Sequence, residues 1–376
     1  MNVELFFNAL RNNEIEFFSG VPDSLLKSFC AYLNDAKFKH NYTTACEGGA
    51  MAMAIGYHLQ TNNIPCVFMQ NSGLGNIVNP LLSLADDKVY SIPMLMVIGW
   101  RGEISASGEQ VKDEPQHKKQ GLVTLDLLEA MGVEYKLIEA DTENVNDLLS
   151  DLVTLAQSTS RPVAIVVRKD TFEAYKEKKP NTNKYLLKRE DAIATIIDNI
   201  DPTSKFVATT GMISRELFEL RVKNNEDHSR DFLTVGGMGF ASQIAAGIAS
   251  NAPHQPIYCL DGDGAFLMHM GSLVLNSGFD MTHIVLNNEA HDSVGGQATK
   301  ISSVNIPGVA LACGYTFAKT VLTKESLKLA LEESKDYKGA RIIEVKVAMG
   351  ARSDLGRPTL SSKEMKALFM SSIDAE

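Results

Sequence analysis

Short runs of apolar residues alternate along the chain with longer segments in which apolar and polar residues recur at helical spacing. The apolar runs have the length of β-strands that are buried on both faces, as the strands of parallel sheets are. The segments between them, for example residues 24–33, 50–59 and 145–157, are amphipathic and long enough for helices. This alternation predicts an α/β fold made of parallel sheets with helices on both faces.

The apolar runs form two series on either side of a charged segment. Residues 169–189 are rich in charge, contain Pro180 and have little apolar periodicity, which is typical of a surface linker. The expected strands lie at residues 16–19, 42–45, 66–70, 94–98, 135–138 and 163–167, and then at 206–209, 232–235, 257–260, 283–286, 316–319 and 342–347. A chain of 376 residues is too long for one ordinary core. We therefore expect a first domain at residues 1–170, a linker at 171–189 and a second domain at 190–376, without a clear sequence repeat between them.

The composition restricts the partners and the compartment. The net charge of −10 argues against nucleic acid, because phosphate contacts need a basic surface, but a few local cations suffice for a small anionic substrate. The five cysteines are scattered, mostly within apolar runs, which is typical of free thiols in a reducing compartment. The N-terminus lacks the pattern of a signal peptide, and no apolar run has the length of a membrane span. We expect a cytoplasmic protein that binds neither nucleic acid nor a membrane.

Polar turns follow two of the expected strands in the second series. Gly262, Asp263 and Gly264 come after residues 257–260, and the pair Asn287-Asn288 comes after residues 283–286. The segment between them, residues 266–278, has helical spacing, which makes the whole a βαβ unit. Ligands bind at the carboxyl ends of parallel strands, so the carboxylate and the amide could face one site. Such oxygens suit Mg²⁺, and the glycines allow the backbone to approach phosphates closely.

This pair of turns resembles the cofactor motif of the thiamine diphosphate-dependent enzymes, a GDG turn followed by a closing NN pair. The resemblance implies thiamine diphosphate and Mg²⁺ as cofactors, with Asp263, Asn288 and the main-chain carbonyl of Ala290 as metal ligands. Gly262, Gly264 and Ala265 would then contact the diphosphate. It also implies a pyrimidine-binding domain followed by a diphosphate-binding domain, and the length leaves no room for the central third domain of many 2-oxo acid decarboxylases. The interval between the turns is slightly short for the pyruvate decarboxylases, which implies a trimmed helix or loop.

The same family places a catalytic glutamate where a strand of the pyrimidine-binding domain meets a helix rich in glycine and alanine. The segment TTACEGGAMAMAIG puts Glu47 at such a junction. In the family this carboxylate binds the aminopyrimidine ring of the cofactor and favours the tautomer that acts as internal base. The alternative is an acidic residue at a helix N-terminus that is stabilised by the helix dipole.

Glycine-containing loops resemble the remaining cofactor contacts of the family. In the segment that begins at Gly236, Met238 follows Gly237 and occupies the position that holds the cofactor rings in a bent shape, although a core methionine has the same pattern. Gly211 and Met212 follow another expected strand and would meet the phosphates. Gly73 belongs to residues 71–76, which resemble the loop that lines the active site.

Two further residues of the first domain are candidates for catalysis. Asp23, in GVPDS, lies one position away from the catalytic aspartate of pyruvate decarboxylases, and it could equally be a helix N-cap. His117 lies in the long polar segment 101–121, where an imidazole could donate a proton to the reaction intermediate or merely be exposed to solvent.

Three segments together resemble the phosphonopyruvate decarboxylases, with the sulfopyruvate decarboxylases as near relatives that often have two separate subunits. They are GVPDS, DEPQH and GARSDLGRPTLSSKE. The resemblance implies decarboxylation of 3-phosphonopyruvate, a small anionic 2-oxo acid, to phosphonoacetaldehyde and CO₂. Cations should then bind the phosphonate, and the candidates are Arg352, Arg357 and Lys118, with Arg101 and Lys119 as competitors.

Other functions remain open at this point. A sulfopyruvate decarboxylase, another 2-oxo acid decarboxylase or a carboligating synthase would use the same cofactor residues, and a regulatory or structural subunit could retain the fold without activity. The presence of Glu47, Asp263 and Asn288 argues against an inactive subunit. The resemblance also implies a homo-oligomer, a dimer or a multiple of it, with each active site shared between subunits.

Overall fold

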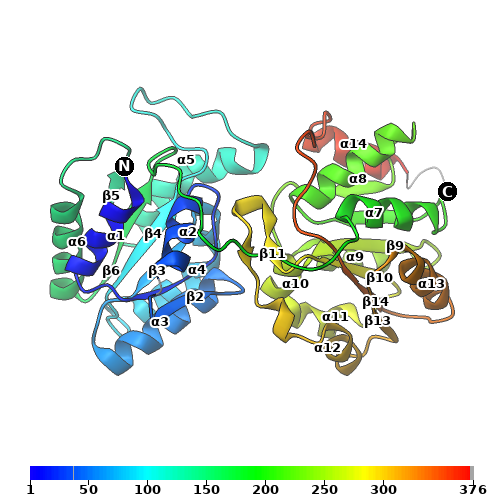
Figure 1. Ribbon diagram of the computed structural model, residues 1–376, viewed down its shortest axis with the longest axis horizontal. Helices are drawn as coiled ribbons and strands as arrows, with labels where there is room; N and C mark the ends of the chain where they lie inside the picture. Colours follow the sequence, from blue (N-terminus) through cyan, green and yellow to red (C-terminus); the bar gives the residue numbers. More distant parts are fainter. Residues whose placement is uncertain (37, 373–376) are drawn as a thin grey trace. The chain divides into compact units, whose positions relative to one another are not determined.

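The computed structural model describes residues 1–36 and 38–372, and it divides into two compact units. Unit 1 comprises Met1–Pro180 and unit 2 comprises Asn181–Glu376. Each unit contains one six-stranded sheet in which all neighbouring strands are parallel (Figure 1). The expected α/β fold with two parallel sheets is thereby confirmed.

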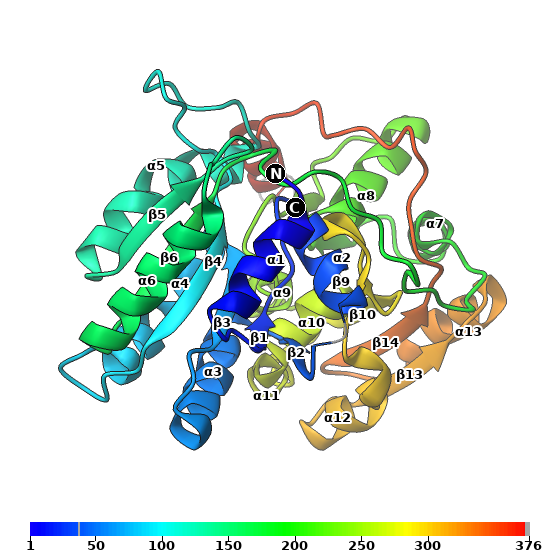
Figure 2. The same cartoon turned by 60° about the vertical axis from the view of Figure 1, so that its left-hand side comes forward.

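The sheet of unit 1 has the strand order β2-β1-β3-β4-β6-β5. Its strands are β1 (Phe17–Gly20), β2 (His40–Thr43), β3 (Cys66–Gln70), β4 (Met94–Gly99), β5 (Glu134–Ile138) and β6 (Pro162–Val167). One face packs against α1 (Val3–Asn12), α2 (Lys27–Asp35) and α6 (Val145–Thr159). The other face packs against α3 (Glu47–Thr61), α4 (Leu74–Pro80) and α5 (Pro115–Ala130), and both layers can be followed in Figure 2.

Burial explains why the strands of unit 1 have the sequences they have. Every residue of β4 and of β6, which lie inside the sheet, is buried, and both strands are almost entirely apolar. The edge strand β5 instead alternates between exposed and less exposed positions, and its sequence EYKLI alternates in the same way. Helices on both faces demand continuous apolar runs, whereas an edge strand needs only partial cover.

The sheet of unit 2 has the strand order β13-β14-β10-β9-β7-β8. Its strands are β7 (Lys205–Ala208), β8 (Asp231–Leu233), β9 (Ile257–Gly262), β10 (Thr282–Asn287), β13 (Phe317–Val321) and β14 (Arg341–Lys346). One face packs against α7 (Arg189–Asp198), α8 (Met212–Lys223), α13 (Lys324–Ser334) and α14 (Ser362–Ser371). The other face packs against α9 (Ala241–Ala249), α10 (Asp263–Met268), α11 (Leu273–Asn276) and α12 (Ile306–Ala312).

A helix expected over residues 266–278 is interrupted. Helix α10 ends at Met268, and a 3₁₀ turn at Met270–Ser272 precedes the short α11. The break lies at His269, whose backbone leaves the helical region (φ −131°, ψ 39°) while its ring stacks on Phe240 at 4.3 Å between centroids. The stretch between the two polar turns is therefore made of short helical pieces.

The segment expected to be a linker contacts both units with different parts. Residues 168–188, all of them described, contain no helix or strand. Tyr175 Oη and the main-chain nitrogen of Lys178 donate hydrogen bonds to Asp35 in unit 1. Asn181 and Asn183 donate hydrogen bonds within unit 2. The exact domain limits stay a prediction.

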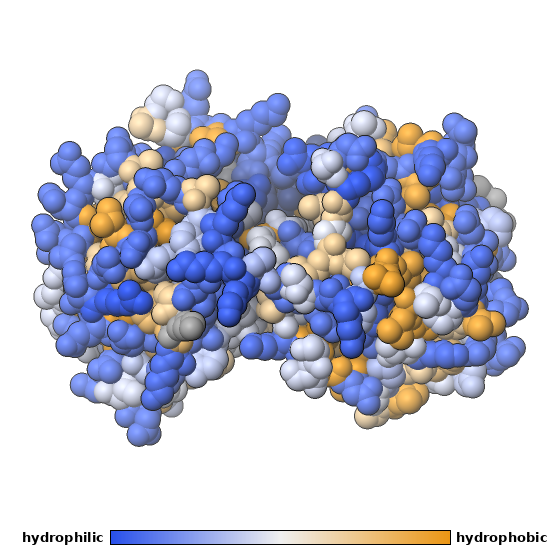
Figure 3. All heavy atoms as spheres, in the orientation of Figure 1, coloured by the Kyte–Doolittle hydropathy of each residue, from blue (hydrophilic) through white to orange (hydrophobic). Residues whose placement is uncertain are grey.

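None of the helices in the described ranges is both long and apolar enough to cross a membrane. On the face seen in Figure 3, hydrophobic side chains gather in patches among hydrophilic ones. All five cysteines are free thiols, and Cys30, Cys66 and Cys259 are buried.

Candidate functional site

The GDG turn of unit 2 lies where β9 ends and α10 begins. Gly262 closes the strand, and Asp263 is the first residue of the helix. The Asp263 side chain is almost completely buried and accepts a hydrogen bond from Thr299 Oγ1. Burial raises the pKa of Asp263 to about 7, against the lowering effect of Thr299. A carboxylate this poorly solvated is stabilised by a cation, so the position fits a metal ligand.

The NN turn lies beside it, because β9 and β10 are neighbours and Gly262 is in register with Leu286. Asn287 is directed away from the turn and donates a hydrogen bond to Glu344 Oε1 at 2.7 Å. Asn288 is buried, and both ends of its side-chain amide form hydrogen bonds. Its Nδ2 donates to Asp292 Oδ2, and its Oδ1 accepts from the main-chain nitrogen of Ala290. The amide oxygen and the Asp263 carboxylate thus come from the carboxyl ends of adjacent strands, as the sequence predicts.

Gly264 shows how closely the other loops of unit 2 approach the GDG turn. A Cβ atom on Gly264 would lie 2.8 Å from His291 Cε1 and 3.1 Å from Met238 Cε, so the position has no room for a side chain. Met238 is half-buried between Gly237 and Gly239, which have φ angles of +66° and +87° that only glycine adopts readily. The structure therefore brings Met238 against the turn that is expected to hold the diphosphate.

Gly211 and Met212 form the start of α8, at the end of β7. Gly211 has a φ angle of +97°, and a Cβ atom there would meet nothing within 4 Å. Its backbone is therefore open on one side, which fits the approach of a phosphate to main-chain N–H groups. Thr210 Oγ1 donates a hydrogen bond to the carbonyl of Val235 at 2.9 Å and so ties this loop to the one that carries Met238. The donors and glycines of unit 2 fit the diphosphate and metal end of thiamine diphosphate.

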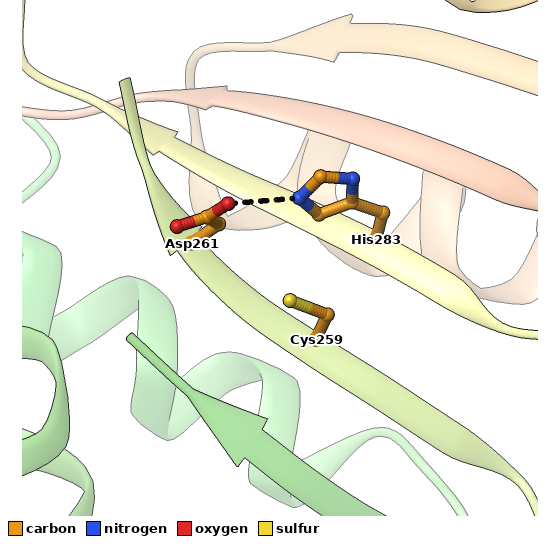
Figure 4. A group of neighbouring side chains, drawn as sticks. All are labelled: Cys259, Asp261 and His283. Carbon is orange, nitrogen blue, oxygen red and sulfur yellow. Dashed lines mark hydrogen bonds and ion pairs between the residues drawn. The ribbon is translucent and has the colours of Figure 1, made fainter. Parts of the chain in front are cut away.

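Below the GDG turn lies a polar cluster that the sequence analysis missed. Cys259, Asp261 and His283 are buried on β9 and β10 and point toward one another (Figure 4). His283 Nε2 lies 3.3 Å from Asp261 Oδ2, and Asp261 Oδ1 accepts a hydrogen bond from the nitrogen of Gly262 at 3.0 Å. Burial raises the pKa of the Cys259 thiol well above its usual range. The Asp261–His283 pair thus braces the strand end from which the GDG turn starts.

Glu47 is the first residue of α3 in unit 1 and is buried at 5% exposure. Asn76 Nδ2 donates a hydrogen bond to Glu47 Oε2 at 2.7 Å. A Cβ atom on Gly73 would lie 2.6 Å from Glu47 Cγ, so this glycine makes room for the carboxylate. Residues 71–76 are helical rather than a loop, within the 3₁₀ turn Asn71–Gly73 and α4. That helix carries Asn76 to Glu47, a contact for which the sequence has no signal.

Asp23 lies fully buried between β1 and α2. Its Oδ2 accepts hydrogen bonds from the nitrogens of Leu25 and Leu26, at 3.0 and 3.3 Å, while its Oδ1 has no partner among the described residues. Helix α2 starts later, at Lys27, so Asp23 supports the turn before the helix and is not its N-cap. Burial raises the pKa of Asp23 to about 6, although the charge of Arg101 opposes this.

His117 is in the first turn of α5, not in an irregular loop, and is mostly buried. Burial lowers the pKa of His117, and the nearby charge of Arg101 lowers it further. Its Nδ1 has no hydrogen-bond partner among the described residues. Arg101 is itself held in place, because its Nε donates to Asp113 Oδ2 at 2.8 Å and its Nη1 donates to Ser24 Oγ at 2.7 Å. The guanidinium is thus fixed in the part of unit 1 that also carries Asp23 and His117.

The three cations expected to bind substrate have different surroundings. In unit 2, the Arg352 guanidinium is engaged in ion pairs with Glu190, Glu219 and Asp354. Arg357 is exposed in the same C-terminal segment, and Lys118 is exposed on α5 of unit 1. An anionic substrate at Arg352 would have to compete with these carboxylates.

Comparison with known proteins identifies the family of both units. Residues 2–137 match the thiamine pyrophosphate enzyme N-terminal TPP binding domain, and residues 209–345 match the C-terminal TPP binding domain. The chain is 31% identical over 369 residues to a phosphonopyruvate decarboxylase of Streptomyces viridochromogenes, covering 93% of this chain and 89% of the relative. A phosphonopyruvate decarboxylase of Streptomyces hygroscopicus is 32% identical over 372 residues, covering 93% and 88%. A sulfopyruvate decarboxylase of Methanosarcina acetivorans is 25% identical over 399 residues, covering 99% and 98%.

Proposed function

The chain belongs to the thiamine pyrophosphate enzymes, on the branch that contains the phosphonopyruvate and sulfopyruvate decarboxylases, and we propose that it decarboxylates 3-phosphonopyruvate to phosphonoacetaldehyde and CO₂. Enzymes of this family use thiamine diphosphate together with Mg²⁺. The observation that carries the proposal is that the buried side chains of Asp263 and Asn288 follow neighbouring parallel strands, β9 and β10, at the same edge of the sheet. Thiamine diphosphate supplies the thiazolium ring that accepts the electron pair left behind when CO₂ departs.

The residues of unit 2 hold the cofactor and its metal in this proposal. Asp263, Asn288 and the main-chain carbonyl of Ala290 are the Mg²⁺ ligands, which leaves positions for diphosphate oxygens and water. Met238 supports the cofactor rings from the loop against the GDG turn. The diphosphate is bound by main-chain groups of Gly211, Met212, Gly237, Gly262, Gly264 and Ala265.

The residues of unit 1 move protons in this proposal. Glu47 binds the aminopyrimidine ring, and Asn76 and Gly73 fix the direction of its carboxylate. Asp23 and His117 are the groups that donate protons after CO₂ has left. The pKa of Asp23, raised to about 6 by burial, lies close to the range in which a carboxyl group can both hold and release a proton near neutrality.

The phosphonate distinguishes this substrate from pyruvate and requires cations. Arg352, Arg357 and Lys118 are the residues that we propose for this contact. The loop cation Arg101 is the competitor, since Asp113 and Ser24 hold its guanidinium beside Asp23.

We also propose a cytoplasmic homo-oligomer, a dimer or a multiple of it, with active sites shared between subunits. Glu47 belongs to unit 1 and Asp263 belongs to unit 2, so each site needs both kinds of unit. Large apolar side chains are exposed on both units, including Tyr90 at 67%, Val274 at 67% and Leu275 at 66%, and such side chains are available for a subunit interface. Free cysteines are consistent with a reducing compartment.

A substrate panel tests the proposed function. The full chain is assayed for CO₂ release with Mg²⁺, thiamine diphosphate and, in separate reactions, phosphonopyruvate, sulfopyruvate and pyruvate. We expect the highest kcat/KM with phosphonopyruvate and release of phosphonoacetaldehyde. A preference for sulfopyruvate would assign the chain to the other activity on this branch, and formation of 2-hydroxyketones from pyruvate would indicate a carboligating synthase. Omission of thiamine diphosphate is the control and should abolish CO₂ release.

A further inference from the structure

The carboxylate of Asp292 accepts hydrogen bonds from three separate parts of unit 2. Its Oδ2 lies 2.6 Å from Asn288 Nδ2 and 3.0 Å from Arg189 Nη1. The main-chain nitrogen of Gly350, at the start of the C-terminal segment, donates to the same atom at 3.0 Å. One oxygen therefore joins the turn after β10 to a buried arginine of α7 and to the segment after β14.

These contacts determine which way the side-chain amide of Asn288 points. A carboxylate only accepts hydrogen bonds, so the end of the amide that faces Asp292 must be the NH₂ group. At the other end, the main-chain N–H of Ala290 donates to Oδ1 at 3.1 Å, which requires an oxygen there. The amide cannot turn over without losing both bonds. The oxygen, which retains a second lone pair, is thus held on the side away from Asp292.

Asp292 is in turn held by Arg189, a buried side chain with 5% exposure. Arg189 donates from Nε and Nη2 to the two carboxylate oxygens of Glu216, at 2.8 and 3.0 Å. A bidentate pair of this kind fixes the plane of the guanidinium, so its Nη1 has one direction, toward Asp292. Two carboxylates around one guanidinium also leave excess negative charge beside the turn, which favours a cation there.

We propose that Asp292, fixed by Arg189, is a positioning residue that makes Asn288 present oxygen, and not its NH₂ group, to Mg²⁺. The inference rests on the proposed role of Asn288 as a metal ligand and adds the group that controls that ligand. An NH₂ group offers no lone pair to a cation, so any population of the reversed amide is lost for metal binding. Loss of a partner that orients a metal ligand typically weakens metal binding, because the ligand atom is then no longer held in one direction.

Exchange of the two side chains tests this role. Asp292→Asn removes the obligate acceptor, and the Mg²⁺ dissociation constant should rise about 10- to 100-fold. Asn288→Asp places two carboxylates against each other and should also weaken binding, although a carboxylate is a good ligand for Mg²⁺. In the double variant the amide at position 292 can donate a hydrogen bond to the carboxylate at position 288, so the pair again has one donor and one acceptor. Its Mg²⁺ dissociation constant should lie within about tenfold of the wild-type value. The constants are measured by isothermal titration calorimetry of Mg²⁺ into the full chain with saturating thiamine diphosphate.

The controls separate positioning from general stability. Asp231 is another buried carboxylate of unit 2, bound by Arg221 at 3.0 and 3.1 Å. Asp231→Asn should lower the melting temperature without changing Mg²⁺ affinity. If Asp292→Asn does not fold, Arg189→Lys is used in its place, because lysine keeps the positive charge but cannot form the bidentate pair of a guanidinium. The loss of Mg²⁺ affinity in Arg189→Lys should be smaller than the loss expected for Asp292→Asn.

Two results would overturn the inference. Wild-type affinity in Asp292→Asn, or in Arg189→Lys where that variant is used, would show that Asn288 needs no positioning. If the loss of Mg²⁺ binding free energy in the double variant equals the sum of the losses in the two single variants, the two side chains do not act as a pair. The variant Asp263→Ala distinguishes failure of the positioning role from failure of the proposed metal site. If Asp263→Ala still binds Mg²⁺, the proposed metal site itself is wrong. If Asp263→Ala loses Mg²⁺ while Asp292→Asn binds it as wild type does, only the positioning role is rejected.

Discussion

At the scale of residues, three carboxylates proposed for cofactor binding or catalysis are buried with few hydrogen-bond donors. Asp263 receives one side-chain bond from Thr299, and Glu47 receives one from Asn76. Asp23 has one oxygen without any partner among the described residues. A buried carboxylate lowers stability unless it is paired, so these positions weaken the free protein. Such groups are typical of functional sites, and a bound cation or cofactor removes part of the cost.

Glu47→Gln tests the role of the carboxylate in unit 1. Glutamine has nearly the same shape and its carbonyl can still accept the bond from Asn76, but it cannot exchange a proton with the cofactor. We expect thiamine diphosphate to bind and kcat to fall about 100-fold or more. The rate of deuterium exchange at C2 of the bound cofactor, followed by NMR, should fall with it. Glu143→Gln, at an exposed position of unit 1, is the control and should leave both rates unchanged.

Asp23→Asn tests burial through the pH dependence of stability. Burial raises the pKa of Asp23 from 3.8 to about 6, so the folded protein binds this proton more tightly than the unfolded chain. The stability of the wild type should therefore fall, on account of this group, as the pH rises from about 4 to about 6. Asparagine does not ionise, so the variant does not lose stability in this way. The melting temperature of the variant minus that of the wild type should increase between about pH 4 and about pH 6 and stay constant above it.

A control of opposite sign exists in the same unit. The pKa of Asp35 is lowered, chiefly by the hydrogen bond from the nitrogen of Lys178, so its contribution to stability is lost as the pH falls. The difference in melting temperature between Asp35→Asn and wild type should shrink toward low pH. A pH-independent difference for Asp23→Asn would contradict the burial of an ionisable carboxyl group at that position.

At the scale of elements, the sequence predicts strands far better than it predicts the pieces between them. All the expected strands are present. The inner strands β4 and β6 are covered by helices on both faces and need uninterrupted apolar runs, whereas the edge strand β5 shows only an alternating pattern. The helix expected over residues 266–278 breaks at His269, which stacks on Phe240, a residue distant in sequence. Residues 71–76 look like a loop because of their glycines and asparagines, yet they form helix in the packed unit. Both errors arise where tertiary contacts override local propensity.

The candidate site was predictable only where a motif names its residues. The GDG and NN turns identify Asp263 and Asn288 because short polar turns after apolar runs stand out. Asn76, Thr299 and Asp292 are ordinary polar residues in sequence, and their roles depend on which side chain the fold brings to them. No spacing rule connects Asn76 with Glu47, because the contact joins two different helices.

Gly264→Ala tests the close packing of the GDG turn. The new methyl group would lie 2.8 Å from His291 Cε1, so the ring or the turn must move, whereas Met238 Cε at 3.1 Å can shift more easily. We expect a loss of about 1–3 kcal/mol in the free energy of unfolding and weaker binding of thiamine diphosphate. Gly247→Ala in α9 is the matched control, because a Cβ atom there meets nothing within 4 Å and alanine favours the helix. Unaltered cofactor binding in Gly264→Ala would mean that the turn does not touch the diphosphate.

Arg352→Ala tests the C-terminal segment as the phosphonate site. If the guanidinium leaves Glu190 and Glu219 to bind the substrate, its removal should lower kcat/KM for phosphonopyruvate and should lower kcat/KM for pyruvate much less. Arg352→Lys should recover only part of this, since an ammonium cannot form the fork. Equal losses for both substrates would assign Arg352 to its ion pairs and direct attention to Arg101.

At the scale of the whole molecule, each unit has its own sheet and its own apolar core, and the residues of the proposed site are divided between the two units. The proposed metal ligands are all in unit 2, whereas Glu47, Asp23 and His117 are in unit 1. The family matches divide the chain in the same way, one for each unit. The proposed site therefore needs one unit of each kind.

Mixing two inactive variants tests whether the two units of one site come from different chains. Glu47→Gln inactivates unit 1 and Asp263→Ala inactivates unit 2. In a mixed dimer with shared sites, one site combines both damaged units and the other combines two intact ones. After random subunit exchange about half of the dimers are mixed, so activity should recover to roughly a quarter of wild type. Each variant incubated alone is the control and should stay inactive. If mass spectrometry shows mixed dimers and activity does not return, each site is built within one chain, and Glu47 must then meet the cofactor bound by its own unit 2.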